Sequence, residues 1–188
     1  MLNLKLEGET YPIKNSLDEL TIKQFEFISS ILNDKEKSHI SKWSEIFIYL
    51  GLPEDIVENL DSFSFIEIIN NFNFTFEELK EKEIVKEIIL DGVSYFAYDE
   101  TFKITVKEMA LIEEYVKKNE NKYLAEIMAV IYKRNDLQKE MQYDKAHIKH
   151  KADLIRTQIT SDIAFPIIGF LAKRLIKDFK LIEDESRN

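Results

Sequence analysis

The chain contains no cysteine, only four glycines and only three prolines among its 188 residues. The lack of cysteine excludes disulfides, thiolate metal sites and cysteine nucleophiles together. Gly8 and Gly92 fall in expected turns, Gly51 follows an expected helix, and Gly169 lies in an apolar run. No cluster of glycines is therefore left for a phosphate-binding loop or a dinucleotide fingerprint, and an intracellular setting fits better than a secreted one.

The balance of charge and hydropathy narrows the class of protein further. A net charge of −9 argues against general nucleic-acid binding, which depends on cations that neutralise phosphates. With 45% hydrophobic and 12% aromatic residues, the chain can fill a core. The longest apolar run, residues 163–172, is too short to span a membrane, and we see no signal peptide. We expect a folded protein without a membrane span.

The sequence resembles itself at a fixed offset of 84 residues. "LEGETY" at 6–11 aligns with "LDGVSY" at 90–95, and "TIKQFEFI" at 21–28 with "TVKEMALI" at 105–112. Similarity at one ungapped offset indicates an internal duplication, although a chance recurrence of a common hairpin-then-helix pattern is the alternative. We expect one compact domain made of a first repeat (1–83), a second repeat (84–135) and a C-terminal helical extension (136–188).

Each repeat is expected to open with a small β-hairpin. Leucines alternate along residues 2–6 ahead of a turn at Glu7-Gly8, and β-forming residues flank the Asp91-Gly92 turn, whose sequence is typical of type I′. We expect strands at 84–90 and 93–98 in the second repeat. Two hairpins are too little sheet to be stable alone, so they should pair with each other or pack under the helices.

The remainder of the sequence predicts helices. Capping boxes begin at Thr21, Ser64, Thr75 and Thr105, where the hydroxyl and a Glu or Gln three residues later can bond reciprocally. Two predicted helices begin near residues 21 and 105, and the apolar residues of 43–50 mark the face of another. Further helices are predicted at 53–60, 64–72, 122–134 and 136–161, with a final one from 162 that contains Pro166. The predicted fold class is mainly α with two small β-hairpins (α+β).

Little in the sequence points to chemistry. Asp144, His147, His150 and Asp153 lie at steps of three, which on one helix drift halfway round the axis, so a solvated face explains them better than zinc. We expect no metal, no cofactor and no enzymatic activity. An enzyme that uses scattered carboxylates is the alternative, because such a site needs no local motif.

Residues 133–156 differ in charge from the rest of the chain. Seven Lys or Arg against four Asp or Glu give them a net charge of +3, which leaves −12 elsewhere. Such a helix could dock on an acidic neighbour or on nucleic acid, although a mixed-charge solvent face is the simpler interpretation. Tyr143 is the only aromatic residue among the lysines, so a stacking platform for single strands is weakly supported. The candidate charged contacts are Lys145, Lys149 and Lys151.

Two stretches rich in aromatic or apolar residues are candidates for a protein interface. They are "SFSFIEIINNFNFTF" at 62–76 and the run at 163–172, and core filling is the default interpretation of both. Any side chains that stay exposed would form an apolar patch of the kind that marks an interface. The candidate interface residues are Phe63, Phe65, Phe72, Phe74, Phe76, Phe165, Ile168 and Phe170.

One sequence pattern consists of Asp91-Gly92 and Tyr95, followed by Thr105-Val106-Lys107-Glu108. It resembles small proteins of tailed bacteriophages that are encoded beside head, neck and tail genes. The abundance of Ile, Lys and Asn is similar to that in crAss-like phages. The resemblance implies a non-enzymatic virion component or cargo of the tail or portal region, in contact with other phage structural proteins and present in several copies. The alternatives are a tail-assembly chaperone absent from the mature particle, and a DNA-binding accessory protein that uses residues 133–156.

Overall fold

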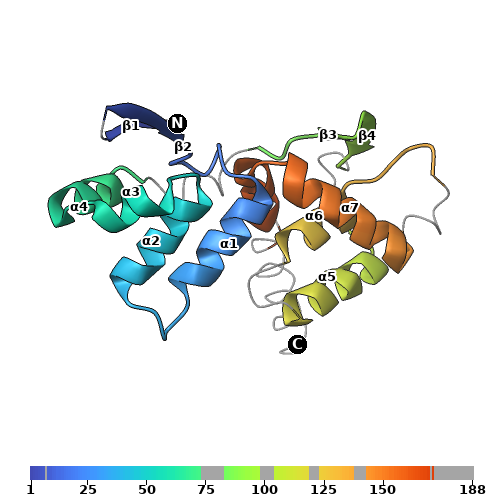
Figure 1. Ribbon diagram of the computed structural model, residues 1–188. Helices are drawn as coiled ribbons and strands as arrows, with labels where there is room; N and C mark the ends of the chain where they lie inside the picture. Colours follow the sequence, from blue (N-terminus) through green and yellow to red (C-terminus); the bar gives the residue numbers. More distant parts are fainter. Residues whose placement is uncertain are drawn as a thin grey trace.

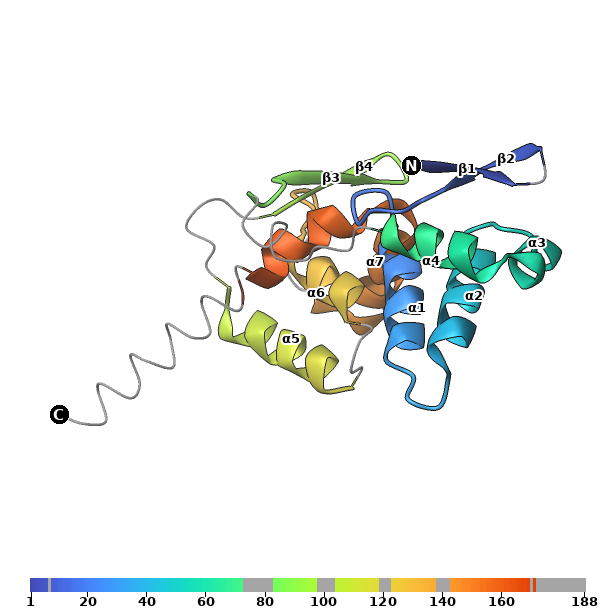
Figure 2. The ribbon, with the colours of Figure 1, turned by 90° about the vertical axis from the view of Figure 1, so that its left-hand side faces the viewer.

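The computed structural model describes residues 1–6, 8–72, 83–97, 104–118, 123–137, 143–169 and 171. Within these residues the protein is mainly helical, with two antiparallel two-stranded sheets. The predicted α+β fold class is therefore confirmed. Both hairpins lie on the same side of the helices, one towards each end of the molecule (Figures 1 and 2).

The first hairpin joins β1 (Leu2–Leu6) to β2 (Glu9–Ile13), with Leu6 opposite Glu9. That register leaves a two-residue turn, in which Gly8 has a φ of 87°. A positive φ costs glycine little, so the turn has the residue that its conformation needs. The far end of the hairpin contributes to the core through Ile13, which is fully buried.

The second hairpin joins β3 (Glu87–Leu90) to β4 (Val93–Phe96) through Asp91-Gly92. Both turn residues have positive φ, 48° for Asp91 and 77° for Gly92, as a type I′ turn requires. The predicted turn is confirmed. The Gln158 side chain holds it from outside, because its amide donates to Asp91 Oδ1 at 2.6 Å and its Oε1 accepts from Asp91 N at 3.1 Å.

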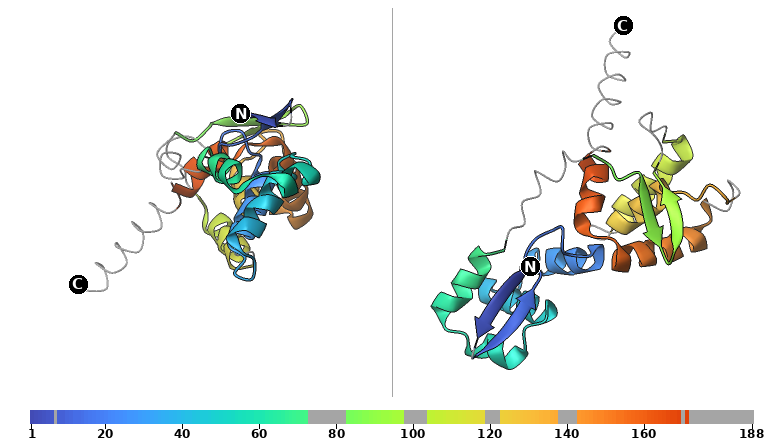
Figure 3. Two further views of the ribbon diagram at one scale, coloured as in Figure 1. Left: turned by 60° about the vertical axis from the view of Figure 1, so that its left-hand side comes forward. Right: turned by 90° about the horizontal axis from the view of Figure 1, so that it is seen from above.

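The two hairpins do not pair with each other, so that part of the prediction is wrong. Each forms its own sheet. The outer edge of β4 instead bonds to the backbone that follows α6, where Phe96 and Lys133 exchange two hydrogen bonds of 2.8 and 2.9 Å. A local partner thus satisfies the edge that a second hairpin would have covered. Seen from above, the hairpins lie well apart (Figure 3).

The first half of the chain forms α1 (Ile22–Leu32), α2 (His39–Tyr49), α3 (Glu54–Asn59) and α4 (Ser62–Asn70). The predicted capping box at Thr21 is present, with reciprocal bonds to Gln24. The box predicted at Ser64 is wrong, because Asp61 caps α4 three residues earlier by accepting from Phe63 N and Ser64 N. The box at Thr75 lies outside the described residues.

α2 ends in a Schellman motif. Leu52 N donates to Phe47 O and Gly51 N donates to Ile48 O, each at 3.0 Å. Gly51 has a φ of 111°, a conformation that a side chain would strain. The motif turns the chain sharply into α3 and so brings α3 against α2.

The second half forms α5 (Val106–Lys118), α6 (Leu124–Ile131) and α7 (Lys145–Gln158), and residues 161–169 form a further helix that runs through Pro166. The capping box at Thr105 is confirmed by its bonds with Glu108. The single helix predicted over 136–161 is wrong. Asp144 accepts from His147 N at 2.9 Å, which starts α7 nine residues later than predicted.

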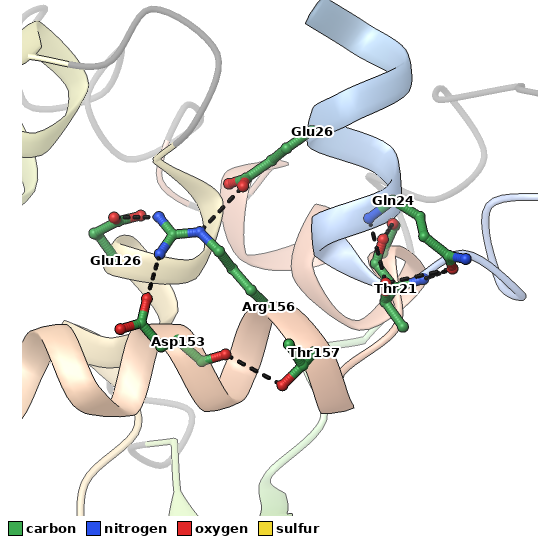
Figure 4. A network of polar contacts seen from close by, with 8 residues as sticks. Thr21, Gln24, Glu26, Glu126, Asp153, Arg156 and Thr157 are labelled. Carbon is green, nitrogen blue, oxygen red and sulfur yellow. Dashed lines mark hydrogen bonds and ion pairs between the residues drawn. The ribbon is translucent and has the colours of Figure 1, made fainter. Parts of the chain in front are cut away.

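α7 connects the two halves of the molecule. It packs against α1, α6 and β3, and beyond its end Ile22 N donates to Ile159 O at 3.0 Å. Arg156 of α7 donates to Glu26 of α1 at 3.1 Å and forms an ion pair with Glu126 of α6 (Figure 4). The part of the predicted C-terminal extension that contains α7 is therefore an integral part of the core, and the boundaries at 83 and 135 stay predictions.

Candidate protein-binding groove

A groove of about 640 Å³ lies between α2, α3 and α4. This volume is within the range of ordinary ligand and peptide pockets. The residues that line it come from α2 (His39, Ile40, Ser44), from α3 and the turn after it (Val57, Glu58, Leu60) and from α4 (Ser62, Phe65, Ile66, Ile69, Asn70).

Two isoleucines of the groove are unusually open to solvent. Ile40 is 67% exposed and Ile66 is 56% exposed, although both are large and apolar. A single exposed isoleucine is ordinary, but two from different helices that line one groove form a contiguous apolar surface. Phe63, on the same helix as Ile66, is 77% exposed and extends the apolar surface of α4.

Aromatic rings support the groove from below. The Phe47 ring lies 5.3 Å from that of Phe65 and 5.6 Å from that of Phe72, and the Trp43 ring lies 5.4 Å from that of Phe72. Contacts at these centroid distances add to the free energy gained by burial and fix the rings relative to one another. Trp43 Nε1 also donates to Nε2 of His39, a lining residue, at 3.3 Å. The groove is thus built on a well-packed cluster.

The surface around the groove is acidic. Residues 51–72 carry five acidic side chains and no Lys or Arg, and all five are exposed: Glu54, Asp55, Glu58, Asp61 and Glu67. Hydrogen bonds from the Ser64 hydroxyl and from backbone amides lower the pKa of Asp61, so its carboxylate stays ionised at neutral pH. Glu58 lines the groove and the other four lie on or beside α3 and α4, so the groove favours an apolar partner segment flanked by basic residues.

The predicted interface residues separate into three groups. Phe63 is exposed, as an interface residue must be. Phe65 and Phe165 are buried, and Phe72 and Ile168 are partly buried against the core, so these four side chains serve the interior. Phe74, Phe76 and Phe170 lie outside the described residues. The default interpretation as core therefore holds for most of the described members.

The predicted charged contacts also differ from one another. Lys145 and Lys149 are exposed, and Lys145 pairs with Glu114 of α5 at 3.2 Å. Lys151 is only 1% exposed and cannot offer its ammonium group to a partner. The prediction that Lys151 is a surface contact is wrong, because it lies on the face of α7 that packs inward beside Ile148, Ala152 and Ile155.

The Lys151 ammonium group is enclosed by the second hairpin and the end of α6. Its Nζ donates to Tyr132 O at 2.7 Å and lies 5.3 Å from the centre of the Tyr95 ring. Burial, with the nearby charge of Lys133, lowers the pKa of Lys151 to about 7. A neutral lysine amine can act as a nucleophile, but an exposed fraction of 1% leaves a substrate no access. We assign Lys151 a structural role.

A second polar cluster joins α5 to the segments around α6 and α7. Glu108, the capping residue of α5, forms an ion pair with Lys133 and accepts from the Tyr143 hydroxyl at 2.9 Å. Lys107 Nζ lies 4.6 Å from the centre of the Tyr143 ring. The capping box of α5 thus also holds Lys133, which follows α6, and Tyr143, which precedes α7.

His147 and His150 are not assembled with other ligands. Among the residues that the structure describes, no group of three or more His, Cys, Asp or Glu side chains is placed to hold a metal ion. His147 Nε2 is buried without a hydrogen-bond partner, and burial together with Lys151 and Arg134 lowers the pKa of His147. Its ring is therefore neutral at physiological pH.

Sequence reasoning missed Ile40 and Ile66. Both occupy positions where a helical pattern alone does not show whether an apolar residue faces the core or the solvent. The signal that could have identified Ile66 is the surplus of apolar residues in "FSFIEII" (63–69), more than a one-sided helix needs.

No protein-family model, curated protein or solved structure matches the chain, so no family is assigned to it. Within the described part of the chain, no helix combines the length and the apolar character needed to cross a membrane.

Proposed function

We propose that the protein is a non-enzymatic interaction protein of a tailed-phage particle, in the tail or portal region, and that the groove between α2, α3 and α4 binds an apolar segment of a neighbouring protein chain in that particle. One observation carries the binding part of this proposal: the groove keeps Ile40 and Ile66 open to solvent above a rigid aromatic cluster. Apolar side chains on two neighbouring helices are the usual basis for binding an amphipathic helix in a groove.

The energetics favour such a partner. Fully burying one isoleucine side chain contributes about 1.5–3 kcal/mol relative to leaving it exposed. Ile40, Ile66 and Phe63 each keep more than half of their surface in solvent. A partner that covers all three therefore gains burial free energy from three side chains, from which the entropic and desolvation costs of association are subtracted. The assignment to a phage rests on the sequence resemblance alone.

A tail-assembly chaperone that leaves before the particle matures would use the same groove. The two functions differ in where the protein ends up, because a virion component is retained in the particle and a chaperone is not. We favour the virion component because several copies of a small protein without disulfides suit a particle interior. The chaperone is the second candidate.

The basic-helix alternative is weaker. Lys133 and Arg156 form ion pairs inside the protein and Lys151 is buried, so three of the cations counted in 133–156 are engaged within the fold. A DNA-binding surface needs cations free to neutralise phosphates.

A photo-crosslinking amino acid at position 66 tests the groove directly. We expect a specific crosslink to another phage structural protein when the labelled chain is made in infected cells. The same label at Val106 is the matched control, because Val106 is 88% exposed on α5 and is not among the residues that line the groove. Equal crosslinking from both positions would show that the groove has no special affinity.

Quantitative mass spectrometry of gradient-purified particles then decides between the two candidates. Peptides of this chain in the particles at a constant ratio to a tail protein would establish a virion component. Their absence from particles, with abundance in the infected lysate, would establish the chaperone and refute the virion assignment.

A further inference from the structure

The charge around the groove sets a requirement on what binds there. Residues 51–72 contribute five exposed carboxylates and no compensating cation, more than half of the net charge of −9 that the whole chain carries. A segment that fills the groove lies against Glu58, a lining residue, and charges closer together than about 8 Å are only partly screened by physiological salt. A basic segment with apolar residues at helical spacing therefore suits the groove best.

Besides α7, which packs into the core, the chain contains a segment of this kind near its C-terminal end. Residues 172–182, "AKRLIKDFKLI", carry four Lys or Arg and one Asp, a net charge of +3 in an acidic protein. Leu175, Phe179 and Ile182 follow one another at steps of four and three, the spacing of an apolar face. The segment lies outside the described residues.

We infer that the groove between α2, α3 and α4 binds residues 172–182 of a second copy of the same chain. The inference rests on the proposed function, since it names the partner of that groove. The described C-terminal helix, residues 161–169, lies near the middle of the molecule, whereas α3 and α4 form one end of it (Figure 1). That end is where a neighbouring molecule can approach the groove.

The resulting contact would be head-to-tail, because the groove of one copy meets a different surface of the next. Such heterologous contacts generate a closed ring when the rotation between copies closes, and an open chain when it does not. An open chain would have a free groove at one end and a free segment at the other until the assembly closes. Self-association through this contact would place several copies of the protein together without a second protein.

Two single substitutions remove the two sides of the contact. Ile66→Arg places a cation in the groove, and Phe179→Asp places a carboxylate on the apolar face of the segment. In sedimentation velocity over increasing concentration, we expect the wild-type chain to associate beyond its 22.2 kDa monomer. Each variant alone should weaken association by at least about tenfold, the factor that corresponds to about 1.4 kcal/mol. Val106→Arg, a change at a still more exposed position outside the groove, should associate like the wild type.

Mixing the two variants gives the decisive measurement. The Ile66→Arg chain keeps an intact segment and the Phe179→Asp chain keeps an intact groove, so an equimolar mixture should form a 1:1 heterodimer that stops there. Circular dichroism and thermal unfolding of each variant confirm that both are folded, since a misfolded variant would also lower the association.

Three results would overturn the inference. The first is a wild-type chain that stays monomeric at about 200 μM, a concentration far above the Kd of a typical specific complex. The second is a pair of variants that associate like the wild type, and the third is a mixture that forms no heterodimer. A segment bound within its own chain would give the first of these, while the mixed variants would still form a heterodimer. None of them touches the proposed function, which fails separately if position 66 crosslinks to nothing that Val106 does not.

Discussion

Residues 2–49 and 86–133 contain the same elements in the same order, a hairpin followed by two helices, yet the two helix pairs end in different surroundings. β2 and β4 begin 84 residues apart, at Glu9 and Val93, and α1 and α5 begin 84 residues apart, at Ile22 and Val106. Both first helices begin with a threonine capping box. Equal spacing is what a duplication produces, and the duplication itself stays a prediction, to be tested by superposing the two units.

The second helix of each pair shows the difference. Every residue of α6 except Glu126 is buried, whereas α2 buries only Trp43, Ile46 and Phe47. α7 covers α6 along its length and closes the core there. α3 packs on α2, and the groove between α2, α3 and α4 stays open to solvent. The two units therefore share their local structure and differ in what packs on them, which indicates that the covering helix decides between a core and a binding surface.

The largest expected effect comes from breaking the connection between the two units. Arg156→Met removes the cation that joins Glu26 and Glu126, and leaves the buried Glu26 carboxylate without this charged partner. Loss of one partner of a buried ion pair costs about 3–5 kcal/mol of unfolding free energy. Urea unfolding measures it. Arg134→Ala, which breaks a pair with the exposed Asp136, is the control and should cost less than about 1 kcal/mol. Equal costs would mean that Arg156 does not connect the units.

The buried Lys151, under the second hairpin, should also make the unfolding free energy of the protein depend on pH. The pKa of Lys151 is lowered in the folded state to about 7 from 10.5, so between these values the unfolded chain binds more protons than the folded one. Stability should therefore rise with pH across this window, by about 2 kcal/mol between pH 7 and pH 9. Below pH 7 the lysine is protonated in both states and the cost of burying its charge is fully present.

Lys151→Met removes that titrating group while keeping a side chain of similar length. We expect the rise between pH 7 and pH 9 to disappear in the variant, as measured by urea unfolding at both pH values. Lys149→Met, on the exposed face of the same helix, should leave the rise unchanged. A rise of equal size in both variants would assign the pH dependence to another group.

A smaller effect should be the same in the two units. Thr21→Ala and Thr105→Ala remove the hydroxyl that accepts from the backbone of Gln24 and of Glu108, in each case at 3.3 Å. Loss of such a cap costs about 1 kcal/mol. We expect the two costs, measured by thermal unfolding, to agree within about 0.5 kcal/mol. A cap that matters in only one unit would weaken the comparison at the local level.

The sequence was sufficient where structure is decided by neighbouring residues. The Asp91-Gly92 turn and the threonine boxes at 21 and 105 depend on bonds within a few residues, and all three are present. It was misleading where two local signals compete. Asp61 and Asp144 each begin a helix at a position different from the predicted one. Aspartate caps a helix as well as serine does, so a sequence with several such residues allows more than one helix start.

The candidate site was largely hidden from sequence for a related reason. Phe65 and Phe72 look like an aromatic patch but pack against Trp43 and Phe47, and Lys151 looks like a surface cation but lies under Tyr95. Which side chains are covered depends on contacts between segments far apart in the chain. Periodicity identifies a face of a helix, and tertiary packing decides whether that face meets another element or the solvent.

The smallest expected effect separates the two units most directly, because Ile40 and Leu124 occupy equivalent positions at the 84-residue offset, near the start of α2 and at the start of α6. Ile40 is 67% exposed and Leu124 is 6% exposed. Ile40→Ala removes side-chain atoms that solvent already surrounds, so the unfolding free energy should change by no more than about 0.5 kcal/mol. Leu124→Ala opens a cavity in the core and should cost about 2–5 kcal/mol. Urea unfolding of both variants at one pH provides the comparison. A large cost at Ile40 would show that this isoleucine is covered in solution, either by a second copy or by its own chain. If a second copy covers it, the cost should fall when the protein is diluted.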